Sequence, residues 1–543
     1  MIVHLKNIRK NILHRGLGIT LNDLRKLCED HHLVRFLPKI DAIANDYALL
    51  RQFFTNGFED PERDKLYAKL ERKLYGVTTE LLVEGIADQN PTFKQSRVNS
   101  FRNPIEYDTI ENALLSYDQE LTMASLEVDA SERQKEIHQR LLRYRIALFD
   151  SIYSSMLWTE MDAQVMTAVL TSPLVAVIDQ QIILSGILLA QRTVFDVWKF
   201  NTLCKVTTTG VSIEVSERAL VAVALALPDD IELQINRDII EDAFGAMLAH
   251  NGVKQRLTEL QVQMILCLDT AKNDKTISED ILPTLMRNSK TIINPEKTAE
   301  ENIDALLNPD AEERNMEAVE EAVEKMRSMQ QNGADVFFGG FSQTKRFSFF
   351  YTLMNWFCPF YIEHPQLRLA NISDLPREFL GKLVDAQQFC NSDKYSFLLS
   401  ISHVINQIPK EMIDMIKNGE VSSTFETDAD GHDAAFVRRL YLNDLYRFFC
   451  LYTDKSHFRS PFSSGANAVF FLNDLMKEHF NGTRYALKVC NNTYRHHHYD
   501  TLESLLSQYA DDTNMEYIKL RALCADKQGD AILAMRYYQE ILD

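Results

Sequence analysis

The sequence predicts an all-α fold, a right-handed α-α superhelix made of stacked antiparallel helix pairs. Three observations support this prediction. Gly and Pro, which interrupt helices, number only 18 and 14 among 543 residues, about half of their usual abundance. Apolar residues recur at helical spacing along many segments, and no alternating strand pattern recurs. The last segment of the chain carries the pattern of a helical repeat.

The chain is long enough for several domains, and changes in composition suggest where they divide. The segment 294–332 contains eleven acidic and four basic residues, and its sequence favours a helix. The first half is expected to resemble the alternating helix pairs of HEAT-type arrays. The predicted parts are an N-terminal helical region 1–125, a helical-repeat core 126–293, an acidic linker helix 294–333, an aromatic-rich helical segment 334–416, a flexible linker 417–433 and repeat-like helices 434–543.

The clearest single helix is predicted over residues 131–158. Its apolar positions form one stripe with a period close to 3.6 residues. Ser131 and Gln134 have the spacing of a capping box, in which each side chain satisfies a backbone amide at the helix start. The residues of the stripe are Ile137, Leu141, Tyr144, Leu148, Ile152 and Met156.

Other segments are assigned from apolar runs and breaks. The run 219–227 lacks a polar face, which predicts a helix deep in the core. The segment 173–192 carries Asp179 near its middle, so it is expected to be a buried helix and not a membrane span. The polar segment 89–103 is predicted to be a loop, and 206–215 is a candidate short hairpin.

Eleven of the 27 residues in 335–361 are aromatic, and this cluster is predicted to be buried core. Phe347, Phe350, Met354 and Phe357 have the spacing of one helical stripe. The alternative is a hydrophobic groove for a partner peptide. The predicted partner-binding residues are Phe338, Phe341, Lys345, Arg346, Tyr494, Arg495 and His497.

The net charge of −19 predicts a basic protein partner, with binding weakened by salt, and argues against direct nucleic-acid binding. The short basic stretch 7–15 is interpreted as a solvated helix face. Eight scattered cysteines without metal spacing indicate free thiols in a reducing, cytoplasmic environment.

Three further patterns are weighed against structural explanations. The segment 428–433 lacks the acidic twelfth ligand of a calcium loop, so a solvated loop is preferred. The histidines of 495–500 are interpreted as surface or groove residues. The segment 390–396 could hold an activated thiol, but Ser392 or Asp393 as a helix cap is simpler. Nucleotide, hydrolase and metalloprotease motifs are all missing, so no catalytic residue, cofactor or metal is expected.

The segment YIKLRALCADKQGDAILAMRYYQEILD, residues 517–543, resembles a tetratricopeptide repeat. In that motif small residues let two helices approach closely, a Gly-Asp turn joins them, and an aromatic fills the groove toward the next unit. The resemblance implies that Ala522, Gly529, Asp530, Ala534 and Tyr538 take these positions.

The middle of the chain, including FCNSDKYSF and YLNDLYRFFCLYTDKSHFRSPF, resembles a group of large bacterial proteins with tetratricopeptide repeats. This resemblance extends from about residue 130 to the C-terminus. It implies an all-helical repeat fold and implies no activity.

Together these observations predict a non-catalytic protein–protein interaction scaffold, with a peptide or basic segment bound in a concave groove. The first alternative is a regulatory or accessory subunit of a bacterial enzyme system, which could act on nucleic acid through its partner. The second alternative is an enzyme whose site carries no recognisable motif.

Overall fold

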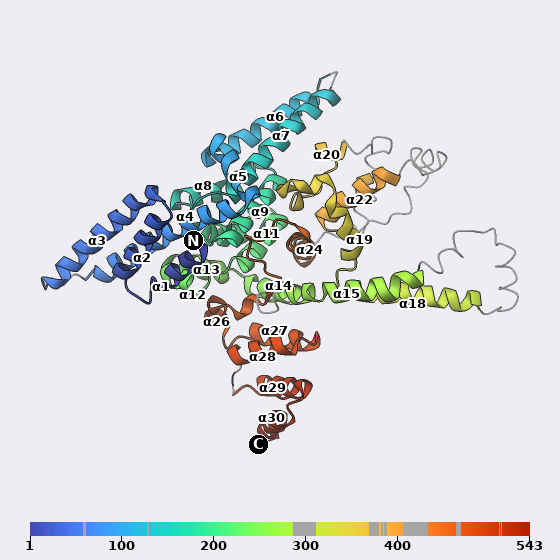
Figure 1. Ribbon diagram of the computed structural model, residues 1–543. Helices are drawn as coiled ribbons and strands as arrows, with labels where there is room; N and C mark the ends of the chain where they lie inside the picture. Colours follow the sequence, from blue (N-terminus) through green and yellow to red (C-terminus); the bar gives the residue numbers. More distant parts are fainter. Residues whose placement is uncertain are drawn as a thin grey trace.

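Figure 1 shows the computed structural model of the chain. It describes residues 1–57, 61–127, 130–285, 311–368, 380–381, 384, 388–404, 433–462, 468–509, 511 and 513–542. Every regular element in these ranges is helical, so the predicted all-α class is confirmed. None of the helices described has the length and apolarity needed to cross a membrane.

The N-terminal helices form a small core of their own. They are α1 (Ile2–Asn11), α2 (Leu17–Asp30), α3 (Leu37–Thr55) and the long α4 (Arg63–Gln89). The start of α1 lies close against Gly85 of α4, where a Cβ atom would meet Met1 Cε at 2.5 Å and Ile2 Cγ1 at 3.1 Å. The missing side chain at Gly85 therefore lets α1 approach the central body.

The central body comprises ten helices that share one continuous apolar core. The central helices α9 and α11 are nearly surrounded by protein; residues 220–223 of α11 have no exposed surface, so the predicted deep burial of 219–227 is confirmed. Burial of α9 likewise confirms the prediction for 173–192. The ten are α5 (Pro91–Arg102), α6 (Ile110–Ala124), α7 (Ala130–Tyr153), α8 (Glu160–Thr171), α9 (Val177–Thr193), α10 (Val197–Thr209), α11 (Ile213–Leu225), α12 (Asp230–Ile235), α13 (Arg237–Ala249) and α14 (Val253–Leu268).

In this region two local predictions are wrong, and the helix predicted over 131–158 is present but has different ends. The segment 89–103 is mostly helix α5, because Asn90 caps it through Phe93 N at 2.8 Å and Pro91 suits the first helical position. The proposed hairpin 206–215 is the junction between α10 and α11, where Ser212 accepts from Val215 N at 3.2 Å. Helix α7 ends at Tyr153 and not at 158, and Ser131 lies within it.

Two helical segments extend from α14 into an arm (Figure 1). They are α15 (Thr270–Thr276), which continues through a π-helical turn over Ile277–Ile281, and α18 (Ala311–Gln331), which packs back against that turn. The described part of the predicted acidic segment 294–333 is thus helical, as expected. Its first residues lie outside the described ranges.

The aromatic-rich segment is core, but it is not one helix. It breaks into α19 (Phe338–Ser342) and three 3₁₀ turns over Gln343–Arg346, Ser348–Tyr351 and Leu353–Trp356. The predicted helical stripe is therefore wrong, while Phe350, Met354 and Phe357 are at most 2% exposed, as a core requires. The segment is flanked by α20 (Pro365–Arg368), α22 (Asn391–Val404) and α24 (Ala434–Leu451).

The C-terminal helices project from the body as a column, drawn in red in Figure 1. Its members are α26 (Asp474–Phe480), α27 (Arg484–Arg495), α28 (Tyr499–Tyr509), α29 (Met515–Gln528) and α30 (Ala531–Leu542). From α27 onward each helix packs against the next. Residues 417–432 of the predicted linker, and with them most of 428–433, lie outside the described ranges; Asp433 caps α24 through Phe436 N at 2.7 Å.

Candidate functional site

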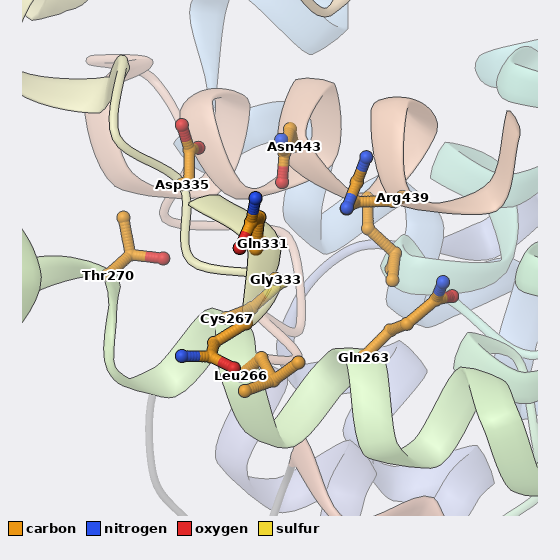
Figure 2. A pocket seen from close by; sticks show the side chains of 11 residues that line it. Gln263, Leu266, Cys267, Thr270, Gln331, Gly333, Asp335, Arg439 and Asn443 are labelled. Atoms are coloured by element: carbon orange, nitrogen blue, oxygen red, sulfur yellow. The ribbon is translucent and has the colours of Figure 1, made fainter. Parts of the chain in front are cut away.

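A pocket of about 170 Å³ opens where α14, the end of α18 and α24 meet (Figure 2). Side-chain amides are the most frequent group in its wall. An amide carries both a donor and an acceptor, as a peptide backbone does. The amide residues are Gln263, Gln331, Asn332 and Asn443, and the other lining residues include Cys267, Thr270, Gly333, Asp335 and Arg439.

Gly333 shapes this pocket by ending α18. Its φ of +87° is a conformation that favours glycine, and Ala334 N then donates to Met329 O at 3.0 Å, which closes the helix end. A Cβ atom at Gly333 would also lie 2.9 Å from Leu266 Cδ1 of α14. The turn therefore holds the end of α18 directly over α14, with Gln331 and Asn332 in the pocket wall.

Gln263 presents an unused acceptor in the pocket. Its Nε2 donates to Ala435 O at 2.8 Å, whereas its Oε1 is buried and has no hydrogen-bond partner among the described residues. A buried polar atom without a partner costs free energy until a ligand or water supplies one. Because this oxygen has almost no exposed surface, it becomes available to a donor in the pocket only when the Gln263 side chain rotates.

The inner wall of the pocket leads into a buried ionic network. Arg447 donates to Asp335 at 2.5 and 3.1 Å and to Asp393 Oδ1 at 2.8 Å, while Lys345 Nζ lies 2.9 Å from Asp393. Burial opposes the charge on Asp393, but attraction to Arg447 and Lys345 lowers the pKa of its carboxyl. The network joins α22, α24 and the aromatic segment, to which both Asp335 and Lys345 belong.

The thiols near this site are not activated nucleophiles. Burial, with Asp335 adding to it, raises the pKa of Cys267 to about 12, and burial raises the pKa of Cys390 well above its ordinary value. The activated-thiol reading of 390–396 is therefore wrong. The simpler reading also needs correction, because Asp393 is an ion-pair partner and Asp444 of α24 accepts from Ser392 N at 2.8 Å.

The predicted partner-binding residues of the aromatic segment have different environments. Phe338 and Phe341 are half-buried, with ring centroids 5.3 Å from Tyr446 and 5.0 Å from Phe389 respectively. Lys345 is only 6% exposed and is occupied by the ionic network, whereas Arg346 is exposed. Only Arg346 of this basic pair is placed to meet a partner.

The second predicted group lies at the junction of α27 and α28. Tyr494 is half-buried, Arg495 and His497 are exposed, and His497 Nδ1 lies 2.8 Å from the hydroxyl of Tyr499. The next residue, His498, contacts Asp269 at the start of α15 at 3.1 Å. Helix α19, which carries Phe338 and Phe341, also contacts α15.

The repeat-motif residues occupy the α29–α30 pair. Ala522 and Ala534 are buried, and Gly529 ends α29 with a φ of +85°. Asp530 accepts from Leu533 N at 3.0 Å, which caps α30. Tyr538 is 39% exposed.

An acidic ridge runs along α18 toward the pocket. Its spacing places all members on one helical face, and all are exposed. An ion pair at 3.4 Å joins the last of them to Arg327. The ridge comprises Glu317, Glu320, Glu321 and Glu324. Sequence reasoning identified the acidic helix but missed the pocket, because its walls come from three distant parts of the chain.

In the described part of the chain, no group of three or more His, Cys, Asp or Glu is arranged to hold a metal ion. Comparison with known proteins gives no match, whether by family models, among curated proteins or among solved structures.

Proposed function

We propose that the protein is a non-catalytic scaffold that binds a basic segment of a partner protein along the acidic ridge of α18 and into the adjacent pocket. The observation that carries the proposal is that both features belong to one helix, since the ridge ends at Glu324, about two turns before Gln331 in the pocket wall. Four exposed carboxylates lead to a pocket lined by four side-chain amides. The ridge offers attraction for Lys or Arg side chains, and the amides offer hydrogen bonds to a peptide backbone.

The position of the pocket adds to this attraction. It lies at the C-terminal end of α18, where the helix dipole favours positive charge. The unused acceptor of Gln263 suits a peptide N–H or a basic side chain. In the wider proposal the helices form an α-solenoid that is HEAT-like in its first part and tetratricopeptide-like in α29 and α30. The half-buried rings of Phe338 and Phe341 extend the surface that contacts the partner.

The test is capture of partner proteins on the immobilised full chain at low salt, followed by elution with rising salt. The decisive variant replaces all four ridge glutamates with glutamine. We expect a captured basic protein to be lost from this variant and to elute from the wild type as salt screens the charges. If the wild type captures no protein at low salt, the proposal fails.

A matched control separates the ridge from the overall negative charge. It replaces four exposed glutamates on other helices with glutamine, namely Glu29, Glu132, Glu136 and Glu160. This variant has the same net charge as the ridge variant and should keep the partner. Equal loss from both variants would show that binding depends on net charge alone and not on the ridge.

A further inference from the structure

A second cavity, of about 450 Å³, is lined in part by α1. Five stretches far apart in sequence form it: α1, the end of α4, residues 193–195 at the end of α9, the start of α12, and the segment 456–459. Its size is that of a typical small-molecule site. One wall is apolar, formed by Ile2, Leu82, Ile86, Val194, Phe195 and Ile231.

The polar wall of this cavity carries an excess of positive charge. Lys6, Arg9, Lys10 and Arg459 face two carboxylates, those of Asp229 and Glu232. This local excess contrasts with the net charge of −19 for the whole chain. Basic groups of α1 are therefore gathered at a cavity, and are not only a solvated helix face as the sequence suggested.

Both carboxylates already have partners. Asp229 pairs with Arg459 at 2.9 Å, and Glu232 lies 3.5 Å from Arg9. Glu232 also accepts from Tyr75 OH at 3.3 Å and from Asp229 N at 2.9 Å, which completes its hydrogen bonding. These two acids therefore hold the two arginines in place and leave the charge of the two lysines uncompensated.

Two observations indicate room for an anionic ligand. Lys6 and Lys10 are exposed, lie one turn apart on α1, and form no ion pair within the described residues. The Nε atoms of Arg9 and Arg459 are buried, and neither has an acceptor in the described part of the chain. Four basic groups thus line one cavity, and the exposed ammonium groups of the two lysines are the donors open to a ligand.

The wall that carries Arg459 is held by a neutral histidine. Asn90 Oδ1 accepts from Phe93 N, so its Nδ2 donates to Asp454 at 2.6 Å and to His457 Nδ1 at 2.9 Å. The imidazole proton then remains on Nε2, which donates to the hydroxyl of Tyr153 at 2.5 Å. Both nitrogens are hydrogen-bonded, so His457 ties this segment to Asn90 and Tyr153.

We propose that this cavity binds a small organic phosphate, with the phosphate group at Lys6, Lys10 and the two arginines and the organic part against the apolar wall. Two uncompensated positive charges match a phosphate monoester, which carries about −1.5 to −2 at neutral pH. A carboxylate would neutralise only one of them. This inference does not depend on the proposed partner site at α18.

The experiment is isothermal titration calorimetry of the full chain with three probes: inorganic phosphate, adenosine monophosphate, and adenosine without phosphate. We expect saturable binding of the monophosphate, about ten-fold tighter than that of adenosine or of inorganic phosphate. Absence of saturable binding by either phosphate probe at millimolar concentration overturns the proposal. Binding of inorganic phosphate with no gain for the monophosphate overturns the organic part of it.

Variants test whether the cavity is the binding site. In Lys6→Gln/Lys10→Gln the affinity for the monophosphate should fall about ten-fold or more. The matched control Lys65→Gln/Lys69→Gln removes two exposed lysines with the same spacing on α4 and should change it less than two-fold. Both pairs are exposed, so folding is expected to persist, which circular dichroism checks. Equal effects of the two double variants would place binding elsewhere.

One more probe distinguishes a small ligand from a polyanion. A neighbouring hollow between α1 and α2 shares Lys10 and adds Arg15 and Lys26, but Asp23 and Asp30 also line it, so the excess of positive charge does not extend far beyond the cavity. A short single-stranded oligonucleotide should bind no better than inorganic phosphate, because the apolar wall suits one organic group and offers no extended track. Binding of the oligonucleotide that exceeds that of the monophosphate would overturn the small-molecule proposal.

Discussion

Lys345 and Arg346 are neighbours in sequence, yet the structure predicts opposite results for their replacement by methionine. The Nζ atom of Lys345 lies 2.9 Å from Asp393 and donates to the hydroxyls of Ser392 and Ser396 at 3.0 Å each, and the residue is 6% exposed. Loss of one partner from a buried ion pair costs about 3–5 kcal/mol. Since Arg447 still pairs with Asp393, we expect the lower end of that range.

Arg346 is exposed, so Arg346→Met should change the free energy of unfolding by less than about 0.5 kcal/mol. Methionine keeps most of the apolar length of either side chain, so the pair isolates the charged group. The free energy of unfolding of both variants is measured by urea titration with tryptophan fluorescence as the signal. Trp356 reports on this region because it packs on Phe350, whose ring centroid lies 4.6 Å from Lys345 Nζ. Equal stability of the two variants would refute the buried network.

Three further results are expected. Gly529→Ala should lower the stability by about 1 kcal/mol because φ at this position is +85°. Gly245→Ala lies in α13 with no atom near the added Cβ, so it should raise the stability by up to about 1 kcal/mol. Thermal unfolding measures both changes, and changes of the same sign would contradict the left-handed turn at Gly529. Burial lowers the pKa of His364 to about 3, so between pH 7 and 5 the unfolded chain binds more protons than the folded chain and the free energy of unfolding falls. In urea titrations over that interval, the free energy of unfolding of His364→Phe should fall by about 2 kcal/mol less than that of the wild type. An unchanged pH dependence would show that His364 is not buried in its neutral form. Seven of the eight free cysteines are buried, so native protein at pH 8 should react slowly with iodoacetamide, and mass spectrometry showing rapid labelling of several thiols would contradict this packing.

Sequence patterns identified helices best where apolar residues ran long or repeated regularly. The burial of 219–227 and 173–192 followed from composition alone, since a helix without a polar face has no stable place at a surface. Errors occurred where one residue type serves two purposes. Pro91 was read as part of a loop although proline also begins helices, and the spacing of the aromatic residues 347–357 matched a helix although the backbone turns repeatedly there.

The candidate sites depended on information that no local pattern holds. Sequence reasoning placed Lys345 in a partner surface, but its environment is set by Asp393 and by Arg447, which pairs with an aspartate 112 residues away. In the same way, α1 and the segment bearing Arg459 meet at one cavity although more than 440 positions separate them in the sequence.

The sequence by itself determined that this chain is helical and which apolar runs are buried, because helical hydrogen bonds link residues four positions apart and amphipathic spacing is a local property. Only the tertiary structure decided which charges are buried in pairs, which remain uncompensated, and where side-chain amides and basic groups gather into cavities. Those outcomes depend on contacts between distant helices, and packing alone brings such residues together.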